Sequence, residues 1–411
     1  MSGTSGLVET MPFASRLRSM LGRRAALALA VLVVVTGVLA TRADAFIYWT
    51  STGAGGAGSI GRANTDGSDP NNTFLSTQGD PVGVAVDSVY IYWTNLREGT
   101  IGRAFLNGSN ANQSWLTVGG NPEGLALDGH HIYWTNAGNA GQSTIGRADI
   151  NGGNVDDNFI TGASFDTGGD VTNGVAVDKT RTHIYWGNGS DGTIGIANLN
   201  GNGAASQINQ SYVNIGPRFN INSVPLGVAV SPDTIFWADG GLRVVGRASI
   251  TIPFPDTSFI PTDEGSGVAV DNAFVYWTNS ILSAGGPELS SIGRADLDGQ
   301  HANKQFINLP PNINLLALAV DAGLTTTPPP SIEHLIAEVT DEGLPHGTAN
   351  SLLAKLDNAQ RKVAAGKLAA ACGSLGAYIN EVQAQSGKKL ETEYADALVL
   401  EATAVREGIG C

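Results

Sequence analysis

The chain has 411 residues, of which 15% are charged and 54 are glycine, and its formal net charge is −14. This length allows two domains with a full core in at least one of them. Few charges and many glycines indicate a fold rich in strands and turns. An acidic chain repels phosphate backbones, so the composition argues against nucleic acid as a partner.

Residues 1–45 have the organisation of an export signal. A basic region with Arg23 and Arg24 precedes an apolar run over 25–41, and the small residues ADA at 43–45 follow as a cleavage site. The alternative is an uncleaved membrane anchor, for which the run is near the short end. We therefore expect a cleaved signal peptide over 1–45, no membrane span after cleavage, and a secreted or cell-envelope location.

A five-residue motif of the type IYWTN occurs six times after this signal. Its tryptophans stand 40 to 52 residues apart and are Trp49, Trp93, Trp134, Trp186, Trp237 and Trp277. Most units continue with a stretch such as TIGRA, an Asn-Gly or Asp-Gly turn, and an apolar strand such as GVAVD. A period of this length with several strands in each unit is typical of a β-propeller.

The order of these strands predicts how the ring closes. The small residues of the GVAVD strands suit the crowded axis, and one tryptophan from each unit would fill each gap between blades. The mature chain would begin inside an aromatic strand at Phe46, and a spare inner strand ends at Asp321. That spare strand would complete the first blade. The predicted fold class is an all-β six-bladed propeller over 46–324 plus a small all-α helical bundle at the C-terminus.

The units resemble the YWTD repeats of the low-density lipoprotein receptor (class B repeats). The resemblance covers about 46–321 and implies a six-bladed propeller that binds other molecules, without naming the ligand. The aspartate of the family motif is present as Asp239. Serine replaces it at Ser51, and asparagine replaces it at Asn95, Asn136, Asn188 and Asn279. Asparagine keeps a hydrogen-bond acceptor but not the negative charge.

The C-terminal part of the chain has a different composition. Residues 325–330 read TTTPPP, a stiff linker, and apolar residues then recur with helical spacing over 331–411. Four short helices are expected there. This stretch resembles the FIMAH-type helical module at the C-terminus of exported bacterial proteins, which implies export but no activity. An export signal with an even cysteine count predicts a disulfide between Cys372 and Cys411, with two free thiols as the alternative.

The aspartates that end the inner strands are the candidate metal ligands. They are Asp87, Asp128, Asp178, Asp271 and Asp321. A ring of carboxylates at one mouth of the channel would hold a cation such as Ca²⁺. The alternative, which the repetition favours, is that each carboxylate caps the turn into the next strand. We therefore expect no cofactor, with Ca²⁺ as the open alternative.

Two long interruptions of the repeat, over 151–173 and 200–225, are the candidate binding loops. Their candidate residues for a cation or a partner are Asp156, Asp157, Asp166, Asp170, Tyr212 and Arg218. The alternative is that these segments are ordinary variable loops.

The functional prediction is a binding scaffold. The propeller sequence has no H-E-x-x-H motif, no G-x-S-x-G motif and no cysteine nucleophile. We expect a non-enzymatic secreted or cell-envelope protein that binds a protein or a glycan at the cell surface. The second hypothesis is a calcium-dependent hydrolase or lyase of the lactonase-like propeller type. The oligomeric state stays open.

Overall fold

The computed structural model describes most of the chain after the expected signal. The described residues are 45–53, 58–137, 143–165, 173–178, 180–199, 205–216, 223–281, 289–321, 331–341, 344–390 and 392–411. The expected linker 325–330 and nearly all of the expected signal lie outside them.

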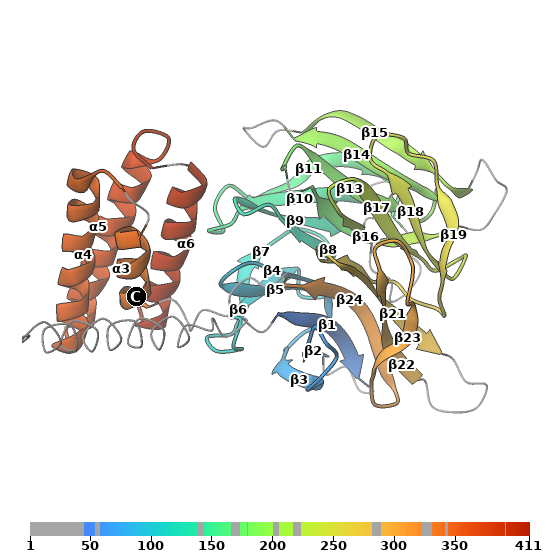
Figure 1. Cartoon of the computed structure of the whole chain (residues 1–411), viewed down its shortest axis with the longest axis horizontal. Helices are drawn as coiled ribbons and strands as arrows, with labels where there is room; N and C mark the ends of the chain where they lie inside the picture. The colour runs from blue at the N-terminus through green and yellow to red at the C-terminus, as the bar shows by residue number, and fades with distance from the viewer. Residues whose placement is uncertain are drawn as a thin grey trace, which may run out of the picture. The chain divides into compact units, whose positions relative to one another are not determined.

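The described strands form six four-stranded antiparallel sheets, which are the blades of a propeller (Figure 1). In order from the innermost to the outermost strand, blades 1 to 3 consist of β24 (Ile313–Val320), β1 (Phe46–Gly53), β2 (Gly58–Asn64) and β3 (Asn71–Ser76); β4 (Pro81–Val86), β5 (Tyr90–Asn95), β6 (Thr100–Phe105) and β7 (Asn112–Thr117); and β8 (Pro122–Leu127), β9 (His131–Asn136), β10 (Ser143–Asp149) and β11 (Asp156–Ala163).

Blades 4 to 6 repeat this plan. They consist of β12 (Val175–Val177), β13 (His183–Asn188), β14 (Thr193–Leu199) and β15 (Ala205–Asn214); β16 (Pro225–Val230), β17 (Thr234–Asp239), β18 (Val244–Ser249) and β19 (Asp256–Pro261); and β20 (Val268–Val270), β21 (Phe274–Ile281), β22 (Leu289–Asp296) and β23 (Asn303–Asn308). The predicted six-bladed fold is confirmed.

The last strand closes the ring, as the order of the repeats predicts. β24 pairs antiparallel with β1, with Trp49 opposite Leu318. Two further hydrogen bonds join the ends of this pair: the N–H of Asp321 donates to the carbonyl of Phe46, and the N–H of Phe46 donates to Asp321 Oδ1, each at 3.0 Å. The first blade therefore combines the two ends of the repeat region, and its innermost edge is covered.

Each tryptophan of the repeated motif is fully buried. Trp93 of blade 2 packs with Tyr48 and Ile60 of blade 1, and Trp134 of blade 3 packs with Tyr92 of blade 2. The tryptophan thus faces the preceding blade, while the tyrosine before it faces the following one. Because these clusters bridge adjacent blades, the expectation that aromatic side chains fill the gaps is confirmed.

The glycine of the TIGRA stretch explains how the tryptophan fits. Trp93 stands opposite Gly102 in the strand register, and a Cβ atom on Gly102 would lie 2.2 Å from the indole ring. The same contact recurs in every blade, with the glycines Gly61, Gly102, Gly146, Gly195, Gly246 and Gly293. The ring therefore lies flat on the backbone of the neighbouring strand, where no side chain can be accommodated.

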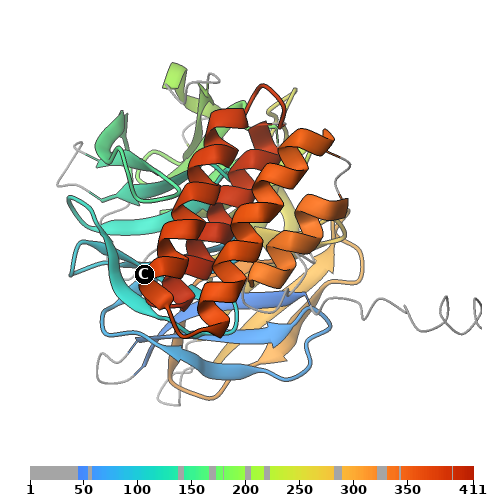
Figure 2. The ribbon, with the colours of Figure 1, turned by 90° about the vertical axis from the view of Figure 1, so that its left-hand side faces the viewer.

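The described helices of the C-terminal part are four: α3 (Ile332–Asp341), α4 (His346–Ala364), α5 (Leu368–Gln385) and α6 (Thr392–Gly408). They pack side by side around an apolar core that includes Leu335, Leu356 and Leu398 (Figure 2). The predicted disulfide between Cys372 and Cys411 is present and joins α5 to the end of the chain. Among the described residues, none of the helices is both long and apolar enough to span a bilayer.

We expect Gly102→Ala to destabilise the propeller. The new methyl group would overlap the Trp93 ring, and overpacking of this kind lowers the free energy of unfolding by about 1–3 kcal/mol. Gly376→Ala on α5 is the control, because its Cβ would meet open space and the helix would gain about 0.5–1 kcal/mol. Urea denaturation followed by tryptophan fluorescence measures both. Equal effects of the two substitutions would contradict the proposed contact.

Candidate functional site

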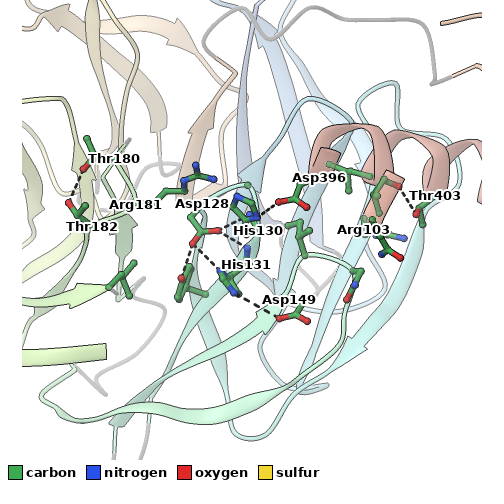
Figure 3. Close-up of a pocket in the computed structure, with 18 of the residues that line it drawn as sticks. Arg103, Asp128, His130, His131, Asp149, Thr180, Arg181, Thr182, Asp396 and Thr403 are labelled. Atoms are coloured by element: carbon green, nitrogen blue, oxygen red, sulfur yellow. Dashed lines mark hydrogen bonds and ion pairs between the residues drawn. The ribbon is translucent and has the colours of Figure 1, made fainter. Parts of the chain in front are cut away.

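A cleft of about 620 Å³ lies between blades 2 to 4 and helix α6 (Figure 3). The turn after β8 contributes Asp128, His130 and His131, strand β10 of the same blade adds Asp149, and blade 4 adds Arg181. Helix α6 supplies the opposite wall with side chains spaced three or four residues apart, namely Asp396, Val399, Leu400, Thr403 and Glu407. This spacing places them on one face of the helix, and the volume is that of a ligand pocket.

Polar contacts join the two walls. His130 Nδ1 lies 2.6 Å from Asp396 Oδ2, and Arg103 Nη2 lies 2.6 Å from Glu407 Oε1. The hydroxyl of Tyr90 donates to Glu407 Oε2 at 3.1 Å. Beneath them, Ala404 of α6 is buried in the apolar cluster of blades 2 and 3. Helix α6 therefore contacts the propeller directly, and the cleft is the open space beside this contact.

The Arg103 side chain is 6% exposed and is held by aromatic rings as well as by Glu407. Its guanidinium carbon lies 4.1 Å from the centroid of Tyr90 and 4.5 Å from that of Trp115. Arginines at the same place in four other blades also stack on aromatic rings: Arg62, Arg147, Arg247 and Arg294. Stacking is thus the general role of this arginine, and blade 2 differs because its guanidinium also receives a carboxylate from α6.

The turn that carries the two histidines is built around Asp128. Its Oδ1 accepts the N–H groups of His130 and His131 at 2.8 and 2.6 Å, and its Oδ2 accepts the hydroxyl of Tyr133 at 2.9 Å. Gly129 has a φ of 85°, a conformation that suits a residue without a Cβ. The carboxylate therefore fixes the turn and directs His130 towards Asp396.

The same arrangement recurs where the sequence suggested a ring of metal ligands. Asp87 accepts the N–H groups of Val89 and Tyr90 and the hydroxyl of Tyr92, and Asp271 makes the equivalent three bonds. Asp178 accepts from Thr182 and is 2.9 Å from His183, while Asp321 binds the N–H of Phe46. These carboxylates are engaged within their own blades, the geometry of a turn cap.

The central channel is narrow. A space of about 40 Å³ is lined by Gly83, Gly124, Gly174, Gly227, Gly267 and Ala317 together with the residues that follow them. Beside it, Glu123 is buried, and its Oε2 accepts both the N–H and the side-chain amide of Asn173. This carboxylate is already engaged by a neighbouring blade.

The described candidate binding-loop residues, Asp156, Asp157 and Tyr212, each make a separate contact. Asp156 accepts the N–H of Asn158 at the start of its own strand, and Asp157 accepts the N–H of Gly119 in blade 2 at 2.9 Å. The hydroxyl of Tyr212 donates to the carbonyl of Ile250 in the next blade. None of these three lines the cleft, and the candidates Asp166, Asp170 and Arg218 lie outside the described residues.

Two residues of blade 2 depart from the repeat, and these departures indicate where the cleft lies. Blade 2 has Tyr90 where blade 1 has Phe46, and it has Trp115 where blade 1 has Phe74. These departures lie around Arg103, the arginine that binds Glu407. Departures from the repeat within regular strands, rather than the longest loops, mark the surface that meets α6.

Comparisons with known proteins yield distant likenesses in structure. No family model and no curated protein matches the sequence. Among solved structures, nidogen in a nidogen/laminin complex is similar at 19% identity and a TM-score of 0.45, over 67% of this chain and 98% of that one. TolB from Acinetobacter baumannii is similar at 15% and 0.44, over 70% of each chain.

Regucalcin from Agrobacterium tumefaciens str. C58, described as a calcium-binding protein, is similar at 9% identity and a TM-score of 0.41, over 58% of this chain and 83% of that one. Likeness at this level of identity says nothing about a shared ligand.

We expect Asp128→Asn to lower the stability of the fold and Asp87→Asn not to lower it. Desolvation raises the pKa of Asp87, so its charged form costs stability above the ordinary carboxyl pKa, and the amide removes that cost. Burial alone would raise the pKa of Asp128 too, but hydrogen bonds from His131 and from the N–H of His130 hold it below its usual value. Its charged form therefore stabilises the fold.

The sign of the pH dependence follows. The stabilisation by Asp128 is present above the carboxyl pKa of the unfolded chain, about 3.9, and is lost as the pH falls through the lower folded value. In urea denaturation at about pH 7, Asp128→Asn should lower the midpoint, and Asp87→Asn should leave it unchanged or raise it. The deficit of Asp128→Asn should shrink below about pH 4. A pH-independent deficit would show that charge is not the cause.

We expect Glu407→Gln to loosen α6 from the propeller. The nearly buried Arg103 would lose its counter-charge, at a cost of about 1–2 kcal/mol to the helix contact. Hydrogen exchange of the α6 amides should become faster while that of the α4 amides stays unchanged. Asp357→Asn, on the exposed side of α4, is the control with the same change of charge. Equal exchange of α6 in both variants would argue against the contact.

Proposed function

We propose that the protein is an extracytoplasmic binding protein whose cleft beside α6 takes a basic, polar segment of another protein. The observation that carries this proposal is the charge of the cleft. Its described lining holds four carboxylates, Asp128, Asp149, Asp396 and Glu407, against two guanidinium groups, Arg103 and Arg181. The formal charge of the whole chain, −14, has the same sign. A cationic segment would therefore be attracted to the cleft.

The character of the lining favours a protein over a glycan. Threonine hydroxyls, an asparagine, a glutamine and imidazoles provide hydrogen-bonding groups, while Ile150, Leu199 and Val399 add small apolar surfaces. Tyr133 also borders the cleft, but its ring is buried and presents no open face on which a sugar could stack. An extended peptide uses such a mixture of hydrogen bonds and small apolar contacts.

We further propose that the protein is exported and that its propeller is of the YWTD type. The disulfide between Cys372 and Cys411 is typical of an oxidising compartment, and it supports removal of a signal over 1–45. Asp239, at the position of the YWTD aspartate, accepts the N–H groups of Val224 and Leu242, which suits a structural role. We therefore assign 46–324 to a YWTD-type propeller, 325–330 to a linker and 331–411 to a FIMAH-type module.

No catalysis is part of this proposal. Asp87, Asp128 and Asp271 are engaged by backbone and tyrosine donors, and the narrow channel is bordered by glycine, alanine and aliphatic side chains. Neither feature favours the calcium-dependent hydrolase or lyase.

The test compares peptides with glycans on the full mature chain. Fluorescence polarisation would measure binding of a panel of labelled twelve-residue peptides rich in lysine and serine, of counterparts with glutamate for lysine, and of a set of neutral and acidic oligosaccharides. We expect binding to the basic peptides that weakens with added salt. Binding to oligosaccharides alone, or to neither class, would contradict the proposed ligand.

Two substitutions that each replace an aspartate by lysine test whether the peptides bind in the cleft. Asp149→Lys at the edge of the cleft should weaken peptide binding at least about 10-fold, because one attractive pair becomes a repulsive one. Asp357→Lys changes the net charge equally on the exposed side of α4 and should change binding less than about 2-fold. If the two variants lose affinity equally, the peptides respond to the whole surface and not to the cleft.

A further inference from the structure

A second polar cluster lies inside the helical bundle, apart from the lining of the cleft. His334 and Glu338 stand one turn apart on α3, and Glu401 comes from α6. The Nε2 atom of His334 is 3.6 Å from Glu338 Oε1 and 3.6 Å from Glu401 Oε2. Among the described residues, these three alone bring three such side chains together, with all three atoms within 4.8 Å of one another.

The distances suit a shared metal ion better than direct hydrogen bonds. A hydrogen bond between nitrogen and oxygen is about 2.7–3.2 Å long, so pairs at 3.6 Å are too far apart. Ligand atoms held about 2.0–2.2 Å from one tetrahedral zinc ion lie roughly 3.3–3.6 Å from each other. The two distances from His334 Nε2 therefore match those between ligands of one small ion, and the third pair lies within 4.8 Å.

Glu401 supplies an independent observation. The residue is 9% exposed, and its Oε2 receives no hydrogen bond among the described residues. The same oxygen is the atom directed at His334 Nε2. A buried carboxylate oxygen without a donor is costly, and here the second carboxylate, Glu338, adds like charge. A divalent cation would bind the unbonded oxygen of Glu401 and would also offset the repulsion between the two carboxylates.

We propose that His334, Glu338 and Glu401 bind one divalent ion of the zinc class and that this ion joins α3 to α6. One imidazole and two carboxylates suit Zn²⁺, whereas Ca²⁺ takes six to eight oxygen ligands. The two negative charges balance the ion. The His334 and Glu338 side chains are 27% and 31% exposed, so water can reach a fourth position and the ion can enter.

The site would act on the helix that also forms one wall of the cleft. Glu401 lies on the bundle face of α6, beside Leu398 and Ala402, whereas Asp396 and Glu407 lie on the face towards the propeller. An ion between α3 and α6 therefore restrains α6 without occupying the cleft. The metal proposal does not depend on the identity of the cleft ligand.

The experiment uses the full mature chain without a polyhistidine tag, treated with EDTA and then freed of it. Isothermal titration with zinc sulfate alone should show one ion per chain, and calcium or magnesium chloride should show none. Cobalt(II) at the same site should give the intense visible absorption of tetrahedral coordination. Less than one zinc ion per chain, or a preference for calcium, would overturn the proposal.

Variants test whether these residues are the ligands. Glu401→Gln keeps the size of the side chain and should weaken zinc binding at least about 100-fold, because loss of a neighbour that only supports a ligand already costs about 10- to 100-fold. His334→Ala should have a similar effect. His346→Ala, at an exposed histidine that begins α4, should bind zinc as the unchanged chain does.

Circular dichroism and the melting temperature without metal would show whether each variant is folded. Zinc should raise the melting temperature of the unchanged chain and of His346→Ala, but not that of Glu401→Gln. If folded Glu401→Gln and His334→Ala bind zinc as tightly as the unchanged chain, the ion lies elsewhere and the proposal is wrong.

Discussion

The contact between each tryptophan and the glycine opposite it determines the rest of the structure. The indole of Trp93 covers Gly102 closely enough that even a methyl group would overlap it. On its other side the ring packs against the preceding blade, with Tyr48 and Ile60. A single sheet could not bury this surface by itself, so each blade requires a neighbour. Six such requirements are met together only when the ring is closed.

Comparison of the six blades also supports a structural role for the inner-strand aspartates rather than a role in binding a ligand. The aspartate at the end of an inner strand binds the tyrosine five residues later in three blades, as Asp87 does with Tyr92. In blade 5 both partners differ together, since Ser231 and Phe236 occupy these places. The paired change agrees with the bonds in the structure and with a structural role.

The sequence predicted the fold far better than the cleft, for a physical reason. The buried tryptophan and the inner strand of small residues recur in every unit, so the reading of one unit applies to the others. The last inner strand, which ends at Asp321, is recognised by the same pattern. The contact of Arg103 with Glu407 joins residues 304 positions apart and occurs once. No period reveals such a pair. Blade 2 does differ from the repeat at Tyr90 and Trp115, but that difference gains meaning only when α6 lies against it.

Two opposite faces of helix α6 are packed against other parts of the chain, and the face towards the bundle carries a buried carboxylate, Glu401. The apolar residues of the helix pack in the bundle, yet Glu401 is buried as well, and the opposite face presents Asp396 and Glu407 to the propeller. A helix that only completed a bundle would gain stability from an apolar residue at position 401. The buried carboxylate of Glu401 is instead placed where a bound cation would compensate its charge. Because α6 is part of the bundle and also forms one wall of the cleft, the packing of the bundle and the geometry of the cleft are physically linked.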